Sequence, residues 1–271
     1  SAASDVYKRQ QYDPVHEVNE VLGEINQERG FQVGIHVDAA SGGFIAPFQD
    51  LPAWDFRLNN VLSISSSGHK YGESCCGTGW VIWRERKGLS EHVAISVTYL
   101  GGKAESYTLN FSRPASGVYV QYYKLMRYGL SGYRQVCDNM MANAKYIRDG
   151  LKEMTFEGKP RFIFLDHGDE GALPVVAAAL NPECGFTYDD IDLQNVLSQH
   201  HWYVGGYKMA LNHPITEETI ALFCDERAEQ TMFRIVVKNN LTQGMADHLL
   251  DSFRASFEFL DAVDFSGLHP V

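Results

Sequence analysis

Two stretches decide the fold of this chain: His36–Phe44, which reads HVDAASGGF, and Ser63–Gly72, which reads SISSSGHKYG. Apolar runs over 31–37 and 60–65 lead into them, and such short runs are typical of buried strands. Each run ends in small and polar residues, as strands of a parallel sheet do where they meet ligand-binding loops. With a third strand expected over 77–83, the sequence predicts an α/β architecture.

Helical patterns flank this core. The segment 13–30 carries apolar residues at helical spacing, opens with an Asp-Pro start signal and stops at Gly30. After Pro114 an apolar face rich in tyrosine predicts one helix, and a second helix is expected over 132–154. The large domain therefore ends in helices.

The rest of the chain reads as a smaller α+β domain. Its expected strands are 161–165, 174–180, 202–203 and 232–237, and its expected helices are 189–199 and 242–260. We therefore expect residues 11–155 to be the C-terminal part of a large domain, residues 156–262 a small domain and residues 263–271 a tail.

The composition narrows the function. The 271 residues are 45% hydrophobic and 21% charged with a net charge of -11, which fits a globular protein and argues against broad nucleic-acid or anionic-membrane binding. The five cysteines show neither a disulfide framework nor zinc spacing, so we expect no metal site. No run approaches the roughly 20 apolar residues of a membrane span, and a cytoplasmic protein is expected.

Lys70 and Asp38 are the residues with the clearest chemistry. A lysine after a small-residue turn is ordinarily a solvated surface charge. Here Asp38 ends the preceding strand, and Ser67 and His69 lie just before the lysine. Pyridoxal phosphate needs an amine to hold it, a carboxylate against its pyridine nitrogen and small donors for its phosphate. These residues supply all three kinds of group.

The two stretches resemble the paired signatures of the group II pyridoxal-phosphate-dependent amino-acid decarboxylases, and within that family glutamate decarboxylases most closely. The supporting motifs are WDFRL at 54–58, GWVIWR at 79–84, YLGG at 99–102 and NFSRPA at 110–115. The resemblance implies the aspartate-aminotransferase-like fold, fold type I, with pyridoxal 5'-phosphate as cofactor and glutamate as substrate. The reaction it implies releases CO2 and yields 4-aminobutyrate.

The resemblance also implies roles for individual residues. Lys70 forms the Schiff base, Asp38 pairs with the pyridine nitrogen, Ala40 packs on the ring, and Ser67 and His69 hold the phosphate.

Three further roles lie outside this loop pair. Ser112 reaches the cofactor phosphate of a neighbouring subunit, Tyr99 lies on a loop that covers the site, and Arg234 receives the substrate α-carboxylate. A homo-oligomer, at least a dimer with shared sites, follows from the role of Ser112. Without the resemblance, Ser112 can simply cap the helix after Pro114, Tyr99 can pack, and Arg234 can be a polar residue on a strand.

The N-terminus does not look native. Ser1–Gln10 reads SAASDVYKRQ and resembles the in-frame translation of a sequencing-library adapter. The family's stacking residue for the cofactor and its groups for the γ-carboxylate of glutamate have no counterpart in this sequence. We therefore expect an N-terminally truncated chain that binds pyridoxal phosphate poorly and is inactive or insoluble alone.

Two alternatives stay open at this point. The first is another group II decarboxylase or a carbon–carbon lyase of the same fold, because the segment that would recognise the distal group of the substrate is absent. The second is a fragment without catalysis.

Calmodulin control is unsupported, because residues 263–271 form no basic amphipathic helix.

Overall fold

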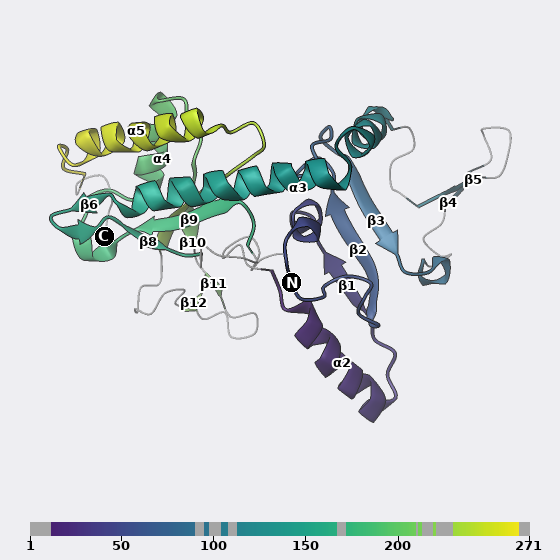
Figure 1. Ribbon diagram of the computed structural model, residues 1–271. Coiled ribbons are helices and arrows are strands. Elements are labelled where there is room, and N and C mark those ends of the chain that lie inside the picture. The colour runs from purple at the N-terminus through teal and green to yellow at the C-terminus, as the bar shows by residue number, and fades with distance from the viewer. Residues whose placement is uncertain are drawn as a thin grey trace. The chain divides into compact units, whose positions relative to one another are not determined.

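The computed structural model describes residues 12–89, 95–97, 104–107, 113–166, 172–209, 211–212, 219–220 and 230–265 (Figure 1). Tyr12–Gln135 forms one compact unit, and the chain from Val136 onward forms a second. Within these ranges no helix combines the length and the apolar character needed to cross a membrane.

The first unit is built on a three-stranded sheet (Figure 1). Strand β1 (Ile35–Asp38) runs parallel to β2 (Val61–Ser67), and β3 (Gly79–Trp83) pairs with β2 in the antiparallel direction. Helix α2 (Val15–Arg29) precedes the sheet and ends at Gly30, whose φ of 66° is the left-handed conformation that glycine favours. The three expected strands and the expected helix are confirmed.

Short elements complete the first unit. They are the 3-10 turns η1 (Gly42–Phe44), η2 (Ala46–Phe48) and η3 (Arg86–Gly88), and the strand pair β4 (Ile95–Val97) and β5 (Ala104–Ser106).

This unit leaves much apolar surface exposed. All five residues of β3 are exposed, α2 buries none of its residues, and only Val61, Ser63 and Ile64 of β2 are buried. The burial that apolar runs typically indicate is therefore reached only in part of β2, which agrees with the expectation that this chain alone exposes an apolar surface. The physical reason is that, in the part of the chain that the structure describes, β1 pairs with β2 alone and no layer covers β3.

Helix α3 (Ser116–Lys152) replaces the two helices expected after Pro114. Its path is broken at Gly129, whose φ of 58° and ψ of -165° are not helical, so the prediction of two helical segments is confirmed with a different boundary. The tyrosine-rich face before the break is exposed, whereas Gln121 on the opposite side is fully buried.

The second unit contains a four-stranded antiparallel sheet in the order β10-β13-β9-β8. Its strands are β8 (Phe162–Phe164), β9 (Val175–Leu180), β10 (Gly205–Met209) and β13 (Gln230–Val236). Three of the four expected strands are confirmed, but the one expected at 202–203 lies a few residues later, at β10. The adjacent Gly205-Gly206 hid this strand, because glycine weakens a strand pattern.

Helices α4 (Asp190–Gln199) and α5 (Gln243–Leu260) lie together on one side of this sheet (Figure 1). Asp189 caps the first turn of α4, and Thr242 caps the first turn of α5. The apolar face of α5 packs on the sheet through aromatic rings, with Phe162 of β8 contacting Phe253 and Phe257 at centroid distances of 6.1 and 5.6 Å. These contacts build the core of the unit.

Minor elements of the second unit are the pairs β6 (Thr155–Phe156) with β7 (Lys159–Pro160) and β11 (Leu211–Asn212) with β12 (Thr219–Ile220), and the turn η5 (Pro182–Cys184).

A buried carboxyl group joins α4 to the sheet. Asp190, only 1% exposed, accepts hydrogen bonds from the Leu180 amide of β9 at 3.0 Å and from the Thr231 hydroxyl of β13 at 2.7 Å. Burial raises the pKa of Asp190 to about 7, although both hydrogen bonds favour the charged form and act in the opposite direction.

This raised pKa makes the second unit less stable as the pH rises. Below the ordinary value of 3.8 the group is protonated in both states; between 3.8 and about 7 only the unfolded chain ionises. The folded unit therefore loses on the order of a few kcal/mol across that window. We expect Asp190→Asn to remove this loss.

Hydrogen exchange of β9 and α4 peptides from both proteins, compared at pH 4 to 8, measures the effect. Comparison at the same pH cancels the intrinsic exchange rate. If the exchange of these peptides depended on pH equally in the wild type and in Asp190→Asn, Asp190 would not be the cause of the pH-dependent stability.

Candidate functional site

The carboxyl ends of β1 and β2 meet at one edge of the sheet. Their parallel register pairs Asp38 with Ser65, and the Ser67 amide donates to the Ala40 carbonyl at 3.1 Å. The loops that follow the two strands therefore lie side by side. Such a strand-end edge is where open α/β sheets bind ligands.

Asp38 is held through one of its two carboxylate oxygens. The Ala40 amide and the Ser65 hydroxyl both donate to Oδ1, at 3.1 and 3.0 Å. No other described residue hydrogen-bonds this carboxylate, so Oδ2 is left for a ligand. A carboxylate between an apolar run and small residues such as Ala39, Ala40 and Gly42 is expected to be buried. The structure instead exposes Asp38, because β1 is an edge strand of the described sheet.

Lys70 follows β2 on a tight turn and reaches back to the β1 loop. Its Nζ donates to the Ser41 hydroxyl at 3.1 Å, and its amide donates to the Ser67 carbonyl at 3.2 Å. The structure thus brings together the amine and the loop that begins at Asp38. The half-buried side chains of Ser67 and Ala40 belong to the same pair of loops.

His69 is exposed, and its ring has a defined orientation. Its Nδ1 lies 2.9 Å from the Thr78 carbonyl oxygen, which also accepts from the His69 amide at 3.2 Å. A carbonyl can only accept, so Nδ1 carries the proton and Nε2 is the nitrogen presented outward.

Two buried residues of α3 support the Lys70 turn, and the sequence analysis missed both. Gln121 Nε2 donates to the Gly72 carbonyl at 2.8 Å, and the Tyr133 hydroxyl donates to the same oxygen at 3.2 Å. A Cβ on Gly68 would lie 2.3 Å from Gln121 Oε1. Glycine is required there because the helix side chain occupies the space.

An ion pair adds a third tie between α3 and this turn. Lys124 Nζ lies 2.8 Å from Glu73 Oε2, and the hydrogen bond to Glu73 raises the pKa of Lys124 well above its usual value. Glu73 itself has a φ of 61°, a left-handed conformation that is uncommon for a residue other than glycine. A polar residue inside an apolar helical pattern was the signal that could have pointed to Gln121.

The roles of the other three predicted site residues stay predictions. Tyr99 and Ser112 fall outside the described residues. Arg234 is on β13 of the second unit, where its Nη2 lies 3.4 Å from the Tyr207 hydroxyl and its guanidinium lies 5.6 Å from the centre of that ring. Both of these contacts lie within the second unit.

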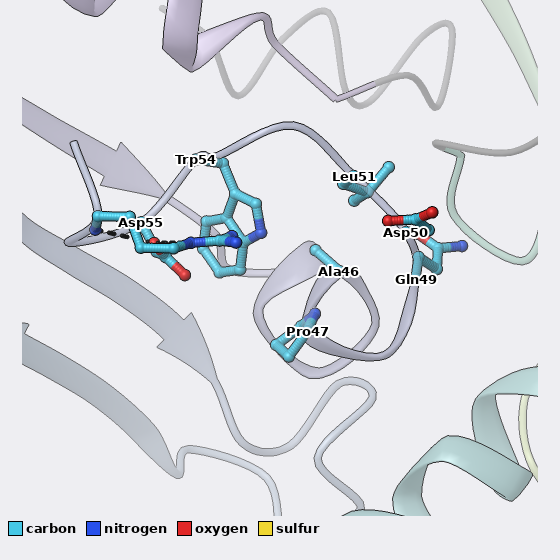
Figure 2. Close-up of a pocket in the computed structure, with 8 residues that line it drawn as sticks. Ala46, Pro47, Gln49, Asp50, Leu51, Trp54 and Asp55 are labelled. Carbon is cyan, nitrogen blue, oxygen red and sulfur yellow. Dashed lines mark hydrogen bonds and ion pairs between the residues drawn. The ribbon is translucent and has the colours of Figure 1, made fainter.

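A pocket of about 320 Å³ lies beside the η2 turn of the first unit (Figure 2). Its lining residues are Ala46, Pro47, Gln49, Asp50, Leu51, Trp54, Asp55 and Arg57. Burial raises the pKa of Asp55, but hydrogen bonds from Arg57 and its charge outweigh this and hold it below its usual value. None of the predicted site residues lines the pocket, so we place the site at the strand ends, where the reactive groups are.

A family model described as the pyridoxal-dependent decarboxylase conserved domain matches residues 7–160. The chain belongs to this family. The predicted fold is confirmed by a glutamate decarboxylase structure from Lactobacillus brevis, which has a TM-score of 0.80 and 33% identity over 97% of this chain and 54% of that one. A sphingosine-1-phosphate lyase from Burkholderia pseudomallei, at 22% identity and a TM-score of 0.66, shares the fold.

The sequence is also similar to curated glutamate decarboxylases, as the family resemblance predicts. Glutamate decarboxylase 5 of Arabidopsis thaliana is 38% identical over 89% of this chain and 44% of its own length. A glutamate decarboxylase of Aliivibrio fischeri is 33% identical over 96% of this chain and 51% of its own length. The chain therefore spans about half the length of the relatives it matches.

The residues at the strand ends fit the family's cofactor. Pyridoxal phosphate needs a carboxylate for its ring nitrogen, and Asp38 Oδ2 is open to a ligand among the described residues. It needs an amine, and Lys70 extends toward the loop that starts at that carboxylate. It needs a small residue beside its ring, and Ala40 follows Asp38 by two positions.

The support from α3 makes Gln121 important for the Lys70 turn. We expect Gln121→Met to cost about 1–3 kcal/mol in the free energy of unfolding, because the Gly72 carbonyl loses its strongest donor in a buried place. Urea denaturation, together with hydrogen exchange of a peptide over 66–74, measures the global and local loss. Gln135→Met, the same change at an exposed position of α3, is the control; equal effects from the two variants would contradict the support role.

Proposed function

We propose that this sequence is the lysine-bearing half of an enzyme that decarboxylates L-glutamate to 4-aminobutyrate and CO2. The proposal rests on one observation: the loop that begins at Asp38 and the turn that holds Lys70 lie side by side at one edge of the sheet. The chain also belongs to the pyridoxal-dependent decarboxylase family. Two groups that the cofactor requires thus come from adjacent parallel strands.

The choice of glutamate rests on the named relatives. Similar curated proteins at 33–38% identity are glutamate decarboxylases, from plants and bacteria alike. A tryptophan decarboxylase from Catharanthus roseus is 18% identical, a level that carries the fold alone. These matches favour glutamate over an aromatic substrate.

Asp38 provides the charge that the reaction needs. When bound, pyridoxal phosphate withdraws the electrons of the breaking Cα–carboxylate bond into its protonated ring. Oδ2 of Asp38 would hold that proton on the ring nitrogen, while the Ala40 amide and the Ser65 hydroxyl fix the carboxylate through Oδ1. A neutral residue in its place would leave the ring without this counter-charge.

Lys70 has two tasks in this scheme. Its amine would hold the cofactor, and the free amine would deliver a proton to the substrate Cα. The Ser41 hydroxyl, 3.1 Å from Nζ, would receive and orient the displaced amine near the reacting carbon. Tyr99 is a second candidate donor for that proton.

The remaining roles are proposed from the family resemblance. Ser67 and His69 hold the phosphate, and Arg234 binds the α-carboxylate of glutamate. Ser112 reaches the phosphate in a neighbouring subunit, so the enzyme is a homo-oligomer of at least two chains. We also propose a cytoplasmic location for this enzyme.

The exposed apolar surface supports a longer parent enzyme. Val21, Phe31 and Val81 are 52–58% exposed, and large apolar patches ordinarily mark surfaces that another segment covers. The remaining half of a decarboxylase chain would cover the free edge of β1. We therefore propose that the 271 residues alone bind the cofactor weakly and lack activity.

Substitutions in the longer enzyme test this function. Lys70→Ala is expected to abolish both the absorbance of lysine-bound cofactor and glutamate-dependent CO2 release. Asp38→Asn should fold, yet lower kcat by about 100-fold or more, because the ring loses its counter-charge.

Exposed residues of the same types provide the controls. Lys87→Ala and Asp138→Asn should leave absorbance and kcat unchanged. Retention of the lysine-bound absorbance in Lys70→Ala would reject the site, and release of CO2 from another amino acid only would reject the substrate.

A further inference from the structure

Cys75 and Cys76 form an adjacent pair of thiols next to the candidate site. Both are exposed, and they occupy the turn that leads from Lys70 to β3. The proposed decarboxylation uses neither of them. Two thiolates on neighbouring residues can act together on one soft atom.

The backbone of this pair disfavours a disulfide between its own sulfurs. The peptide bond between them is trans, which places the two Cα atoms about 3.8 Å apart. Protein disulfides usually span about 4.4–6.8 Å between Cα atoms, so a direct S–S bond would be strained. A single larger atom bound to both sulfurs avoids that strain, because the sulfurs then need not touch.

The turn is fixed in place while its outer side is open. The Thr78 amide donates to the Cys75 carbonyl at 3.2 Å, and the Ser74 amide donates to the Gly68 carbonyl at 2.9 Å. A Cβ placed on Gly77, whose φ is 86°, would meet no atom within 4 Å. The pair is thus held by its backbone, and both of its side chains are exposed.

The same turn is joined to the candidate site through Thr78. Its amide bonds to Cys75, and its carbonyl accepts both the amide and Nδ1 of His69. Any change of the turn that moves the Thr78 carbonyl therefore acts on His69 and on Lys70, the next residue.

We propose that Cys75 and Cys76 are a dithiol site for thiophilic species that bridge two sulfurs, trivalent arsenicals above all, and that occupancy alters the Lys70 turn. With an aryl arsine oxide, two As–S bonds form, the As–O bond breaks, and both thiol protons leave with that oxygen as water. Arsenic stays trivalent, so the step needs no oxidant. The role of the turn in holding a cofactor rests on the proposed function, but the capture does not.

Phenylarsine oxide binding to the reduced 271-residue chain, fused to a cysteine-free carrier that keeps it in solution, tests the capture. One equivalent should bind, and Cys75→Ser or Cys76→Ser should each weaken binding by about 100-fold or more, since either leaves a single thiol. Cys184→Ser is the matched control and should leave the affinity unchanged. Equal affinity in wild type and in the two single variants would overturn the proposal.

Hydrogen exchange of a peptide over 66–73, with and without the arsenical, tests the effect on the turn. The exchange rate should change at least several-fold in the wild type and stay constant in Cys75→Ser. Capture with no change in that peptide would refute the coupling to Lys70. Neither readout depends on decarboxylation, so a failure of the proposed function would be seen separately, in the Lys70→Ala experiment.

Discussion

The parallel pairing of β1 with β2 is the constraint on which the candidate site depends. Side chains at the ends of two parallel strands converge because both strands finish at the same edge, and here the Ser65 hydroxyl bonds directly to Asp38. The register that pairs Asp38 with Ser65 fixes how far each loop extends past the sheet. A shift by one residue would turn Asp38 to the other face and remove the hydroxyl that holds it. The chemistry of the site is thus decided by backbone pairing first.

The second determinant is the helix that follows in the sequence. Gln121, Lys124 and Tyr133 approach the Lys70 turn from α3 and bond to its carbonyl oxygen or its acidic residue. Burying an amide and a phenol costs free energy unless each finds a partner, and Gly72 supplies one oxygen to both. The arrangement makes the turn and the helix dependent on each other within the first unit.

The sequence could predict the site better than its surroundings. Strands β1 to β3 and the residues at their ends follow from apolar runs, small-residue loops and a family signature, all of which are local. Gln121 was missed because its partner lies 49 residues away, so the one local signal, a polar residue inside an apolar helical pattern, does not show what that residue bonds to. The exposure of Asp38 was missed for a related reason. Burial depends on which other segments pack on a strand, and the sequence of the strand itself does not show this. Arg234 was named from resemblance only, and its role stays a prediction.

The Lys70 turn is fastened almost wholly through main-chain oxygens, at Gly68, Gly72 and Thr78. Carbonyl groups are the same whatever side chain a residue carries, so positions such as 75 and 76 can change without loosening the turn. The stretch between Lys70 and β3 can therefore take different side chains while the turn keeps its backbone bonds. The pair of thiols at Cys75 and Cys76 stands in that stretch.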